Sequence, residues 1–127
     1  MAKILVADND PKFVNLMRSV LGARGHEVTV AFGGKQVLEV MRKEKPDLVL
    51  LEIMMSYVLE GLDVCREMAG DPQLKDVPVI VVTSLRGERK EVTAPVGEYV
   101  QVDEWIQKPV KAEELVAKVE EVLRKRE

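Results

Sequence analysis

The chain has 127 residues, 46% of them hydrophobic and only 4% aromatic, so we expect one domain with an aliphatic core. A net charge of -3 argues against a nucleic-acid-binding surface. The single cysteine excludes an internal disulfide framework, and no hydrophobic run is long enough to span a membrane. The start MAKILVAD leads straight into a predicted strand without a signal-peptide pattern, so a cytoplasmic protein is expected.

The N-terminal half predicts a strand, a helix, a second strand and a second helix. The run ILVA before Asp8 predicts a buried strand, and the NDP that follows is typical of a helix start. A helical stripe then continues to Gly22, where the helix is expected to end: Phe13, Leu16, Met17, Val20 and Leu21. Alternation over residues 27–31 predicts a strand, and a helix with Val37 and Met41 on its apolar face follows a GG turn.

The C-terminal half repeats the alternation. Buried strands are predicted for LVLL before Glu52 and for VIVVT ending at Thr83, with a short helix over residues 61–70 between them. A short strand is expected over residues 104–107, and the last helix has this apolar stripe: Leu115, Val116, Val119, Val122 and Leu123. Repeated strand–helix units with short connections indicate an α/β fold with a doubly wound parallel sheet.

The segment over residues 86–101 does not fit this alternation. A helix is expected between the last two strands, yet the segment contains Gly87, Pro95 and Gly97. Proline and glycine both disfavour a helix interior. We expect a shortened or irregular helix, or an ordered loop.

Four predicted strands end at a polar residue: Asp8, Glu52, Thr83 and Lys108. Ligand sites of open parallel sheets lie beyond the carboxyl ends of the strands, so these four side chains should converge on one crevice. Two carboxylates, a hydroxyl and an ammonium group suit a phosphoryl group or a divalent cation.

The segments ILVADNDP, PDLVLLEIMM, VPVIVVTS and WIQKPV resemble the receiver domain of bacterial two-component response regulators. The resemblance covers nearly the whole chain and implies a single receiver-like domain over residues 1–127, without an effector domain in this chain. It implies a flavodoxin-like three-layer sandwich, with five parallel strands in the order 2-1-3-4-5 and helices on both faces. Members of the family accept a phosphoryl group from a histidine kinase onto an aspartate, with magnesium bound.

The resemblance assigns a role to residues at each strand end. The acidic pair falls on Asp8 and Asn9, and the phosphoacceptor position falls on Glu52. The remaining positions are the metal-binding carbonyl of Met54, the hydroxyl of Thr83, the site lysine Lys108 and the switch aromatic Trp105. Asp8, Asn9, Glu52 and Met54 would therefore hold magnesium.

Two of these positions depart from the family pattern. Glu52 carries its carboxylate farther out than aspartate by one C–C bond, about 1.5 Å, and a displacement of about 1 Å can cost about 100-fold in rate. The longer side chain would instead meet Lys108. Asn9 has lost a carboxylate, so the magnesium site should be weak. Asp10 could compensate in part, but we expect it to cap the first helix.

We therefore interpret the chain as a stand-alone atypical receiver, phosphorylation-impaired, and not an enzyme. It would act as an interaction module for a histidine kinase or a downstream signalling protein. Trp105, otherwise a partly exposed strand aromatic, would lie with Tyr99 on the partner surface. The alternative is a working phosphoacceptor that uses magnesium.

A small enzyme or flavin carrier on the same fold is a third, less favoured interpretation. The acidic NDPK after the first strand would repel a phosphate group, and His26 is the only histidine, so no nucleophile–His pair is expected. We expect His26 to be exposed and Cys65 to fill the core.

Overall fold

The computed structural model describes residues 2–55, 60–84, 98–99 and 101–125. Strands and helices alternate up to residue 83 as predicted. They are β1 (Lys3–Ala7), α1 (Pro11–Ala23), β2 (Glu27–Ala31), α2 (Gly34–Glu44), β3 (Leu48–Leu51), α3 (Glu60–Ala69), β4 (Val79–Thr83), β5 (Val102–Gln107) and α5 (Ala112–Lys125).

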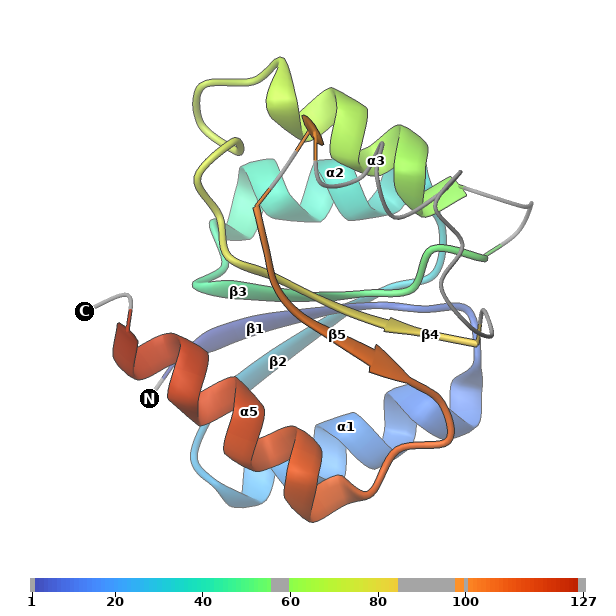
Figure 1. Cartoon of the computed structure of the whole chain (residues 1–127), viewed down its shortest axis with the longest axis vertical. Helices are drawn as coiled ribbons and strands as arrows, with labels where there is room; N and C mark the ends of the chain where they lie inside the picture. The colour runs from blue at the N-terminus through green and yellow to red at the C-terminus, as the bar shows by residue number, and fades with distance from the viewer. Residues whose placement is uncertain (1, 56–59, 85–97, 100, 126–127) are drawn as a thin grey trace.

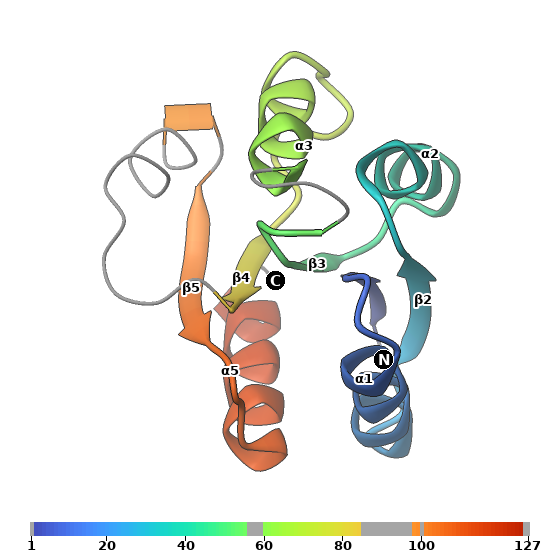
Figure 2. The same cartoon turned by 90° about the vertical axis from the view of Figure 1, so that its right-hand side faces the viewer.

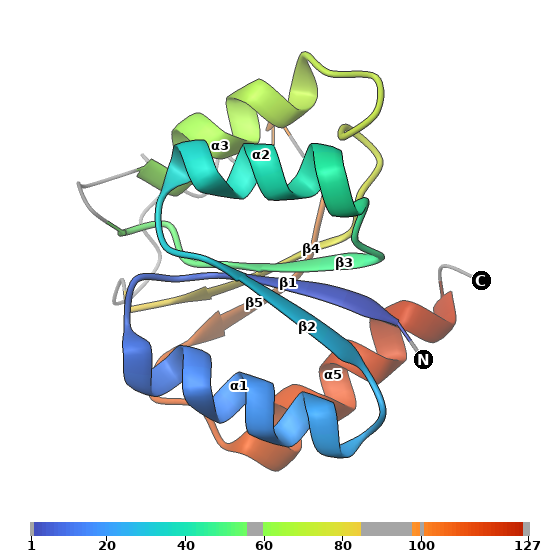
Figure 3. The same ribbon diagram turned by 180° about the vertical axis from the view of Figure 1, so that it is seen from behind.

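The five strands form one parallel sheet in the order β2-β1-β3-β4-β5, which confirms the predicted topology. Helices α2 and α3 cover one face of the sheet, and α1 and α5 cover the other (Figures 1 and 3). Strands β2 and β5 lie at the two edges (Figure 2). All carboxyl ends of the strands therefore point to the same side of the molecule.

Alternate residues of the central strands serve the two faces of the sheet. Leu5, Val49 and Val81 pack in the cluster that contains the buried residues of α2 and α3. Their neighbours Ile4, Leu50 and Ile80 pack in the cluster formed with α1 and α5. Because both faces are covered, these strands are continuous apolar runs rather than alternating ones.

Local sequence explains where α1 begins. The carboxylate of Asp10 accepts a hydrogen bond from Lys12 N at 3.0 Å, and Pro11 is the first helical residue. Both features confirm the predicted helix start, just after β1. The chain then reverses at Gly25, whose φ of 88° lies in the left-handed region that favours glycine.

The expected irregular fourth helix lies largely outside the described residues. Within that segment Glu98 and Tyr99 have helical conformation, and β5 begins at Val102, two residues before the predicted start. In the part of the chain that the structure describes, no helix is long and apolar enough to cross a membrane.

The single cysteine and the single histidine differ in how the structure bears on their predicted environments. Cys65 is buried in the core, as predicted, and this burial raises its pKa to about 12. The expectation that His26 is exposed is wrong, because its side chain is only 8% exposed. Its Nδ1 accepts from Ala2 N at 3.2 Å, and its Nε2 lies 3.3 Å from Oε2 of Glu120.

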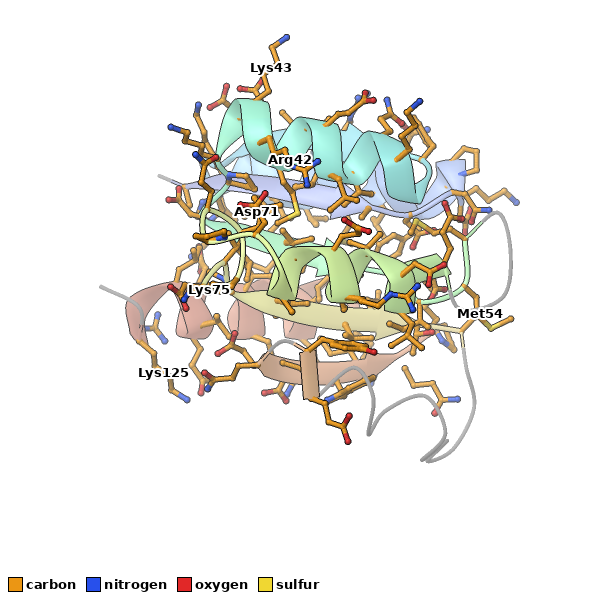
Figure 4. The ribbon with its side chains drawn as sticks, turned by 90° about the horizontal axis from the view of Figure 1, so that it is seen from above. Arg42, Lys43, Met54, Asp71, Lys75 and Lys125 are labelled. Carbon is orange, nitrogen blue, oxygen red and sulfur yellow. The ribbon has the colours of Figure 1, made fainter. Side chains whose placement is uncertain are left out.

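The labelled side chains of Figure 4 mark the two opposite ends of the strands. Met54 follows β3 at the carboxyl edge of the sheet, at the end of the molecule opposite Asp71 and Lys125. Arg42 of α2 points toward Asp71, which follows α3, and their side chains are 3.1 Å apart. This pair joins the two helices of one face near the amino edge.

Candidate functional site

The carboxyl ends of the strands bring the four predicted residues together. Asp8, Glu52 and Thr83 are buried, with 1%, 3% and 7% of their surface exposed. Lys108 follows β5 and donates its backbone N–H to the carbonyl of Thr83 at 2.8 Å. The predicted convergence of these positions is therefore confirmed by the geometry.

The ammonium group of Lys108 lies between the two carboxylates. Its Nζ is 2.6 Å from Oδ2 of Asp8 and 3.5 Å from Oε1 of Glu52. It also lies 4.4 Å from the ring centroid of Phe13, which is in the first turn of α1. A cation over an aromatic face is attracted by the ring quadrupole, so three groups hold this ammonium in place.

The carboxylate of Glu52 accepts hydrogen bonds on both oxygens. Oε2 accepts from the backbone N–H groups of Ile53 at 2.8 Å and Met54 at 3.4 Å. Oε1 accepts from the backbone N–H and the hydroxyl of Ser84, both at 3.1 Å. With Lys108 beside Oε1, the negative charge of this side chain is surrounded by donors.

Asn9 and Asp10 lie at the rim of the site, and both are exposed. Asp10 caps α1, as predicted, and its own backbone N–H donates to Oδ1 of Asp8 at 2.9 Å. The carboxylate of Asp10 is thus bound to the helix start rather than directed to Glu52.

Burial raises the pKa of Asp8 above its ordinary value, since desolvation outweighs the other effects. Hydrogen bonds from Lys108 and from the Asp10 backbone, and the charge of Lys108, act in the opposite direction, while the charge of Glu52 adds to the rise. At Asp8, therefore, the loss of hydration outweighs the close ammonium of Lys108.

The backbone of Glu52 is fixed from behind by the start of α3. Gly61 donates its N–H to Ile53 O at 2.8 Å, and a Cβ on Gly61 would lie 2.6 Å from Ile53 Cα and 2.7 Å from Glu52 O. The neighbouring Glu60, only 6% exposed, accepts a hydrogen bond from the backbone N–H of Gly34 at the start of α2. Gly33, the N-cap of α2, provides no side-chain cap, so Glu60 serves this helix end from α3.

The residues present do not fit a tight magnesium site. Both oxygens of Asp8 are engaged, one by Lys108 and one by the Asp10 backbone. Asn9 offers only an amide, and Glu52 is bound by N–H and O–H donors. Within the ranges that the structure describes, no three His, Cys, Asp or Glu residues are grouped so as to hold a metal ion.

The sequence analysis missed two contributors to the site. Ser84 directly follows Thr83, so its position one residue beyond a strand end was a usable signal. Phe13 was assigned only to the apolar stripe of α1, although the first turn of that helix begins at the carboxyl edge. Trp105 and Tyr99, the predicted partner-surface residues, lie outside the crevice and are 40% and 36% exposed.

A five-stranded parallel sheet with buried carboxylates and a lysine at its carboxyl edge defines a signalling receiver rather than a nucleotide-binding α/β protein. Residues 4–120 match the family model of the response regulator receiver domain. The chain belongs to this family, whose members act in two-component signalling, interact with histidine kinases and generally bind magnesium.

Relatives in sequence include regulators of about twice the length. The chain is 35% identical over 125 residues to the DNA-binding response regulator MtrA of Mycolicibacterium smegmatis, covering 98% of this chain and 52% of that protein. It is 36% identical over 123 residues to the probable transcriptional regulator ycf27 of Pyropia yezoensis, covering 97% and 48%. The chain thus spans about half the length of the curated relatives it matches.

Solved structures show the same fold. The BeF3-activated N-terminal receiver domain of Klebsiella pneumoniae RstA has a TM-score of 0.80 and 31% identity, covering 96% of this chain and 98% of that one. The receiver domain of the Francisella response regulator 1452 has a TM-score of 0.83 at 24% identity and covers both chains fully, which supports the fold alone.

Proposed function

We propose that this receiver domain is a phosphorylation-impaired protein-interaction module and not an enzyme. One observation carries the proposal: the carboxylate of Glu52 is already held by the Ile53, Met54 and Ser84 donors, with Lys108 beside it. A cytoplasmic location is part of the same proposal.

Phosphoryl transfer depends on positioning and on donors that stabilise charge on the transferred group. Here the N–H and O–H donors around Glu52 are used by its own carboxylate. An incoming phosphoryl group would have to displace those hydrogen bonds before it met any stabilising donor. The fixed negative charge of Glu52 thus supports a receiver whose state does not depend on a phosphodonor.

The direct test is incubation with acetyl phosphate and magnesium followed by intact mass measurement. We expect no added phosphoryl mass on the wild type. The double variant Glu52→Asp, Asn9→Asp restores the shorter acceptor and the second carboxylate, so it should gain at least partial labelling. A phosphoryl group mapped to Glu52 in the wild type would instead establish the alternative, a working phosphoacceptor.

Weak magnesium binding belongs to the same proposal. A magnesium ion would compete with Lys108 for Asp8, and the amide of Asn9 is a poorer ligand than a carboxylate. Trp105, the only tryptophan, lies three residues before Lys108 and can report binding by fluorescence. We expect little change up to millimolar magnesium, whereas saturation at micromolar magnesium would contradict the proposal.

We further propose that Trp105 and Tyr99 lie near the centre of the partner surface. Both are large side chains that are at least one-third exposed, and exposed aromatic residues are enriched at binding hot spots. On α5 beside this strand, Lys118 forms an ion pair of 2.8 Å with Glu104 of β5, which adds a charged rim. The partner would be a protein, a histidine kinase or a downstream signalling protein, rather than nucleic acid or a membrane.

Partner capture with purified wild type and two aromatic variants tests this surface. Trp105→Ala should weaken binding by about 1–3 kcal/mol, with or without a phosphodonor. Phe32→Ala is the matched control, because Phe32 is 45% exposed and follows β2 at the opposite edge of the sheet. If Phe32→Ala abolishes capture and Trp105→Ala does not, the surface assignment is wrong.

A further inference from the structure

We propose that Ser84 is a positioning residue that latches the Glu52 carboxylate to the end of β4. This inference rests on the proposed function and goes beyond it, because it names the residue that holds the fixed charge and the strand that this charge controls. Ser84 lies at the surface, whereas Glu52 is 3% exposed, so the latch closes the crevice at its solvent side.

The geometry of the contact is specific to a side-chain hydroxyl. The Ser84 backbone N–H and the Ser84 hydroxyl both reach the same oxygen, Oε1 of Glu52, at 3.1 Å. Any residue except proline would supply the N–H, but the second donor is the side-chain hydroxyl. The latch therefore depends on the identity of the residue after Thr83.

The contact also depends on the length of Glu52. An aspartate carboxylate would end about 1.5 Å short of this position, the length of one C–C bond. From the 3.1 Å separation seen for Glu52, such a retreat would take it beyond hydrogen-bond distance of the Ser84 hydroxyl. The hydroxyl of Ser84 and the length of the Glu52 side chain thus fit one another.

The latch acts on the strand next to the proposed partner surface. Ser84 follows β4, and the carbonyl of its neighbour Thr83 accepts the Lys108 N–H at 2.8 Å. In the β4–β5 pairing, Val81 lies opposite Trp105. Holding the end of β4 through Ser84 therefore holds the strand that carries Trp105, so the Glu52 charge is coupled to that surface.

A double-mutant cycle on the whole chain tests the latch. Urea unfolding would be measured for wild type, Ser84→Ala, Glu52→Asp and the double variant. Ser84→Ala should raise the unfolding equilibrium constant about fivefold when residue 52 is Glu, and by less than about twofold in the Glu52→Asp background. Equal effects in both backgrounds would overturn the proposal.

A conservative variant and a matched serine separate positioning from general damage. Ser84→Thr keeps the hydroxyl and should stay within about twofold of wild type. Ser19→Ala changes an exposed serine of α1, and its effect should be the same in both backgrounds. Ser84→Thr as damaging as Ser84→Ala would contradict the latch.

The link to the partner surface has its own measurement. The emission maximum of Trp105 should shift in Ser84→Ala and should not respond to Ser84→Ala in the Glu52→Asp background. A response independent of residue 52 would remove the coupling. These results are distinct from failure of the proposed function, which would show as a phosphoryl group on wild-type Glu52 whatever the cycle gives.

Discussion

The two ends of the strands carry charged clusters of similar composition in different surroundings. At the carboxyl edge Lys108 and Asp8 are 2.6 Å apart, with side chains only 16% and 2% exposed. At the amino edge Arg24 and Glu120 are 2.8 Å apart, with side chains 57% and 23% exposed. The two ion-pair distances are similar, so burial must account for the different pKa shifts of the Asp8 and Glu120 carboxylates.

The pKa values of the two carboxylates move in opposite directions. The hydrogen bond from Arg24 holds the pKa of Glu120 below its ordinary value, with a further contribution from His26. Burial raises the pKa of Asp8 despite a shorter contact to its cation. A solvent-exposed ion pair favours the charged form of its carboxylate. A buried ion pair must first offset the hydration free energy that its charged groups lose.

Cavity volume does not identify which end of the strands holds the candidate site. A groove of about 900 Å³ lies at the amino edge, lined in part by Arg24, His26 and Glu120. The buried carboxylates and the lysine lie at the other end of the strands. In this fold the strand ends locate the chemistry better than the open volume does.

The largest difference in unfolding free energy should come from alanine substitutions of two glycines, one near the carboxyl ends of the strands and one near their amino ends. Gly61→Ala places a methyl group 2.6 Å from Ile53 Cα and should cost more than about 3 kcal/mol of unfolding free energy. Gly22→Ala, near the end of α1, meets nothing within 4 Å and should stabilise by about 0.5–1 kcal/mol. Urea unfolding measures both, and equal effects would mean that the backbone behind Glu52 is not tightly packed.

Removing the site cation should be the next largest effect. Lys108→Met leaves the buried carboxylates of Asp8 and Glu52 without their ammonium and should cost about 3 kcal/mol at neutral pH. The loss should shrink in acid, where Asp8, whose pKa is raised, takes up a proton. Thermal unfolding at pH 7 and pH 4 checks this, and a deficit that does not change with pH would contradict the electrostatic explanation.

Removing the charge of Asp8 should have a smaller effect of opposite sign. Because its folded-state pKa is raised, the folded protein binds the proton more tightly than the unfolded chain, and this contribution is lost as pH rises through the raised value. Asp8→Asn should therefore gain stability at pH 7, and the gain should vanish below about pH 4, near the ordinary aspartate pKa. Chemical unfolding at several pH values measures it, and a loss of stability at pH 7 would show that the Lys108 contact outweighs burial.

The smallest effect should come from the exposed pair. Arg24→Met removes the first partner of Glu120, and exposed ion pairs contribute little and are screened by salt. Since the pKa of Glu120 is lowered, the contribution of this pair is present above the ordinary glutamate value and is lost as pH falls below it. Melting temperatures with and without 1 M salt (a Debye length of about 3 Å) test this, and a salt-independent loss would mean that packing rather than charge is involved.

Much of the fold and four of the site positions could be predicted because they depend on strand patterns and parallel topology. Thr83 ends a strand, and Asp8, Glu52 and Lys108 each directly follow one. A parallel sheet brings such positions together without any knowledge of the side-chain conformations. Ser84 lies one residue beyond a strand end, but its contact with Oε1 depends on the length and conformation of the Glu52 side chain, which strand patterns do not predict. His26 was misjudged because its partners Ala2 and Glu120 lie 24 and 94 residues away in sequence.

Beryllofluoride binding, followed through backbone N–H resonances, tests the central claim most directly. In the proposed function the Glu52 carboxylate itself accepts the hydrogen bonds of the Ile53, Met54 and Ser84 backbone N–H groups. We predict that beryllofluoride with magnesium leaves these three resonances of the wild type unchanged and shifts them in the Glu52→Asp, Asn9→Asp variant. Saturable shifts of the Ser84 resonance in the wild type would contradict the account.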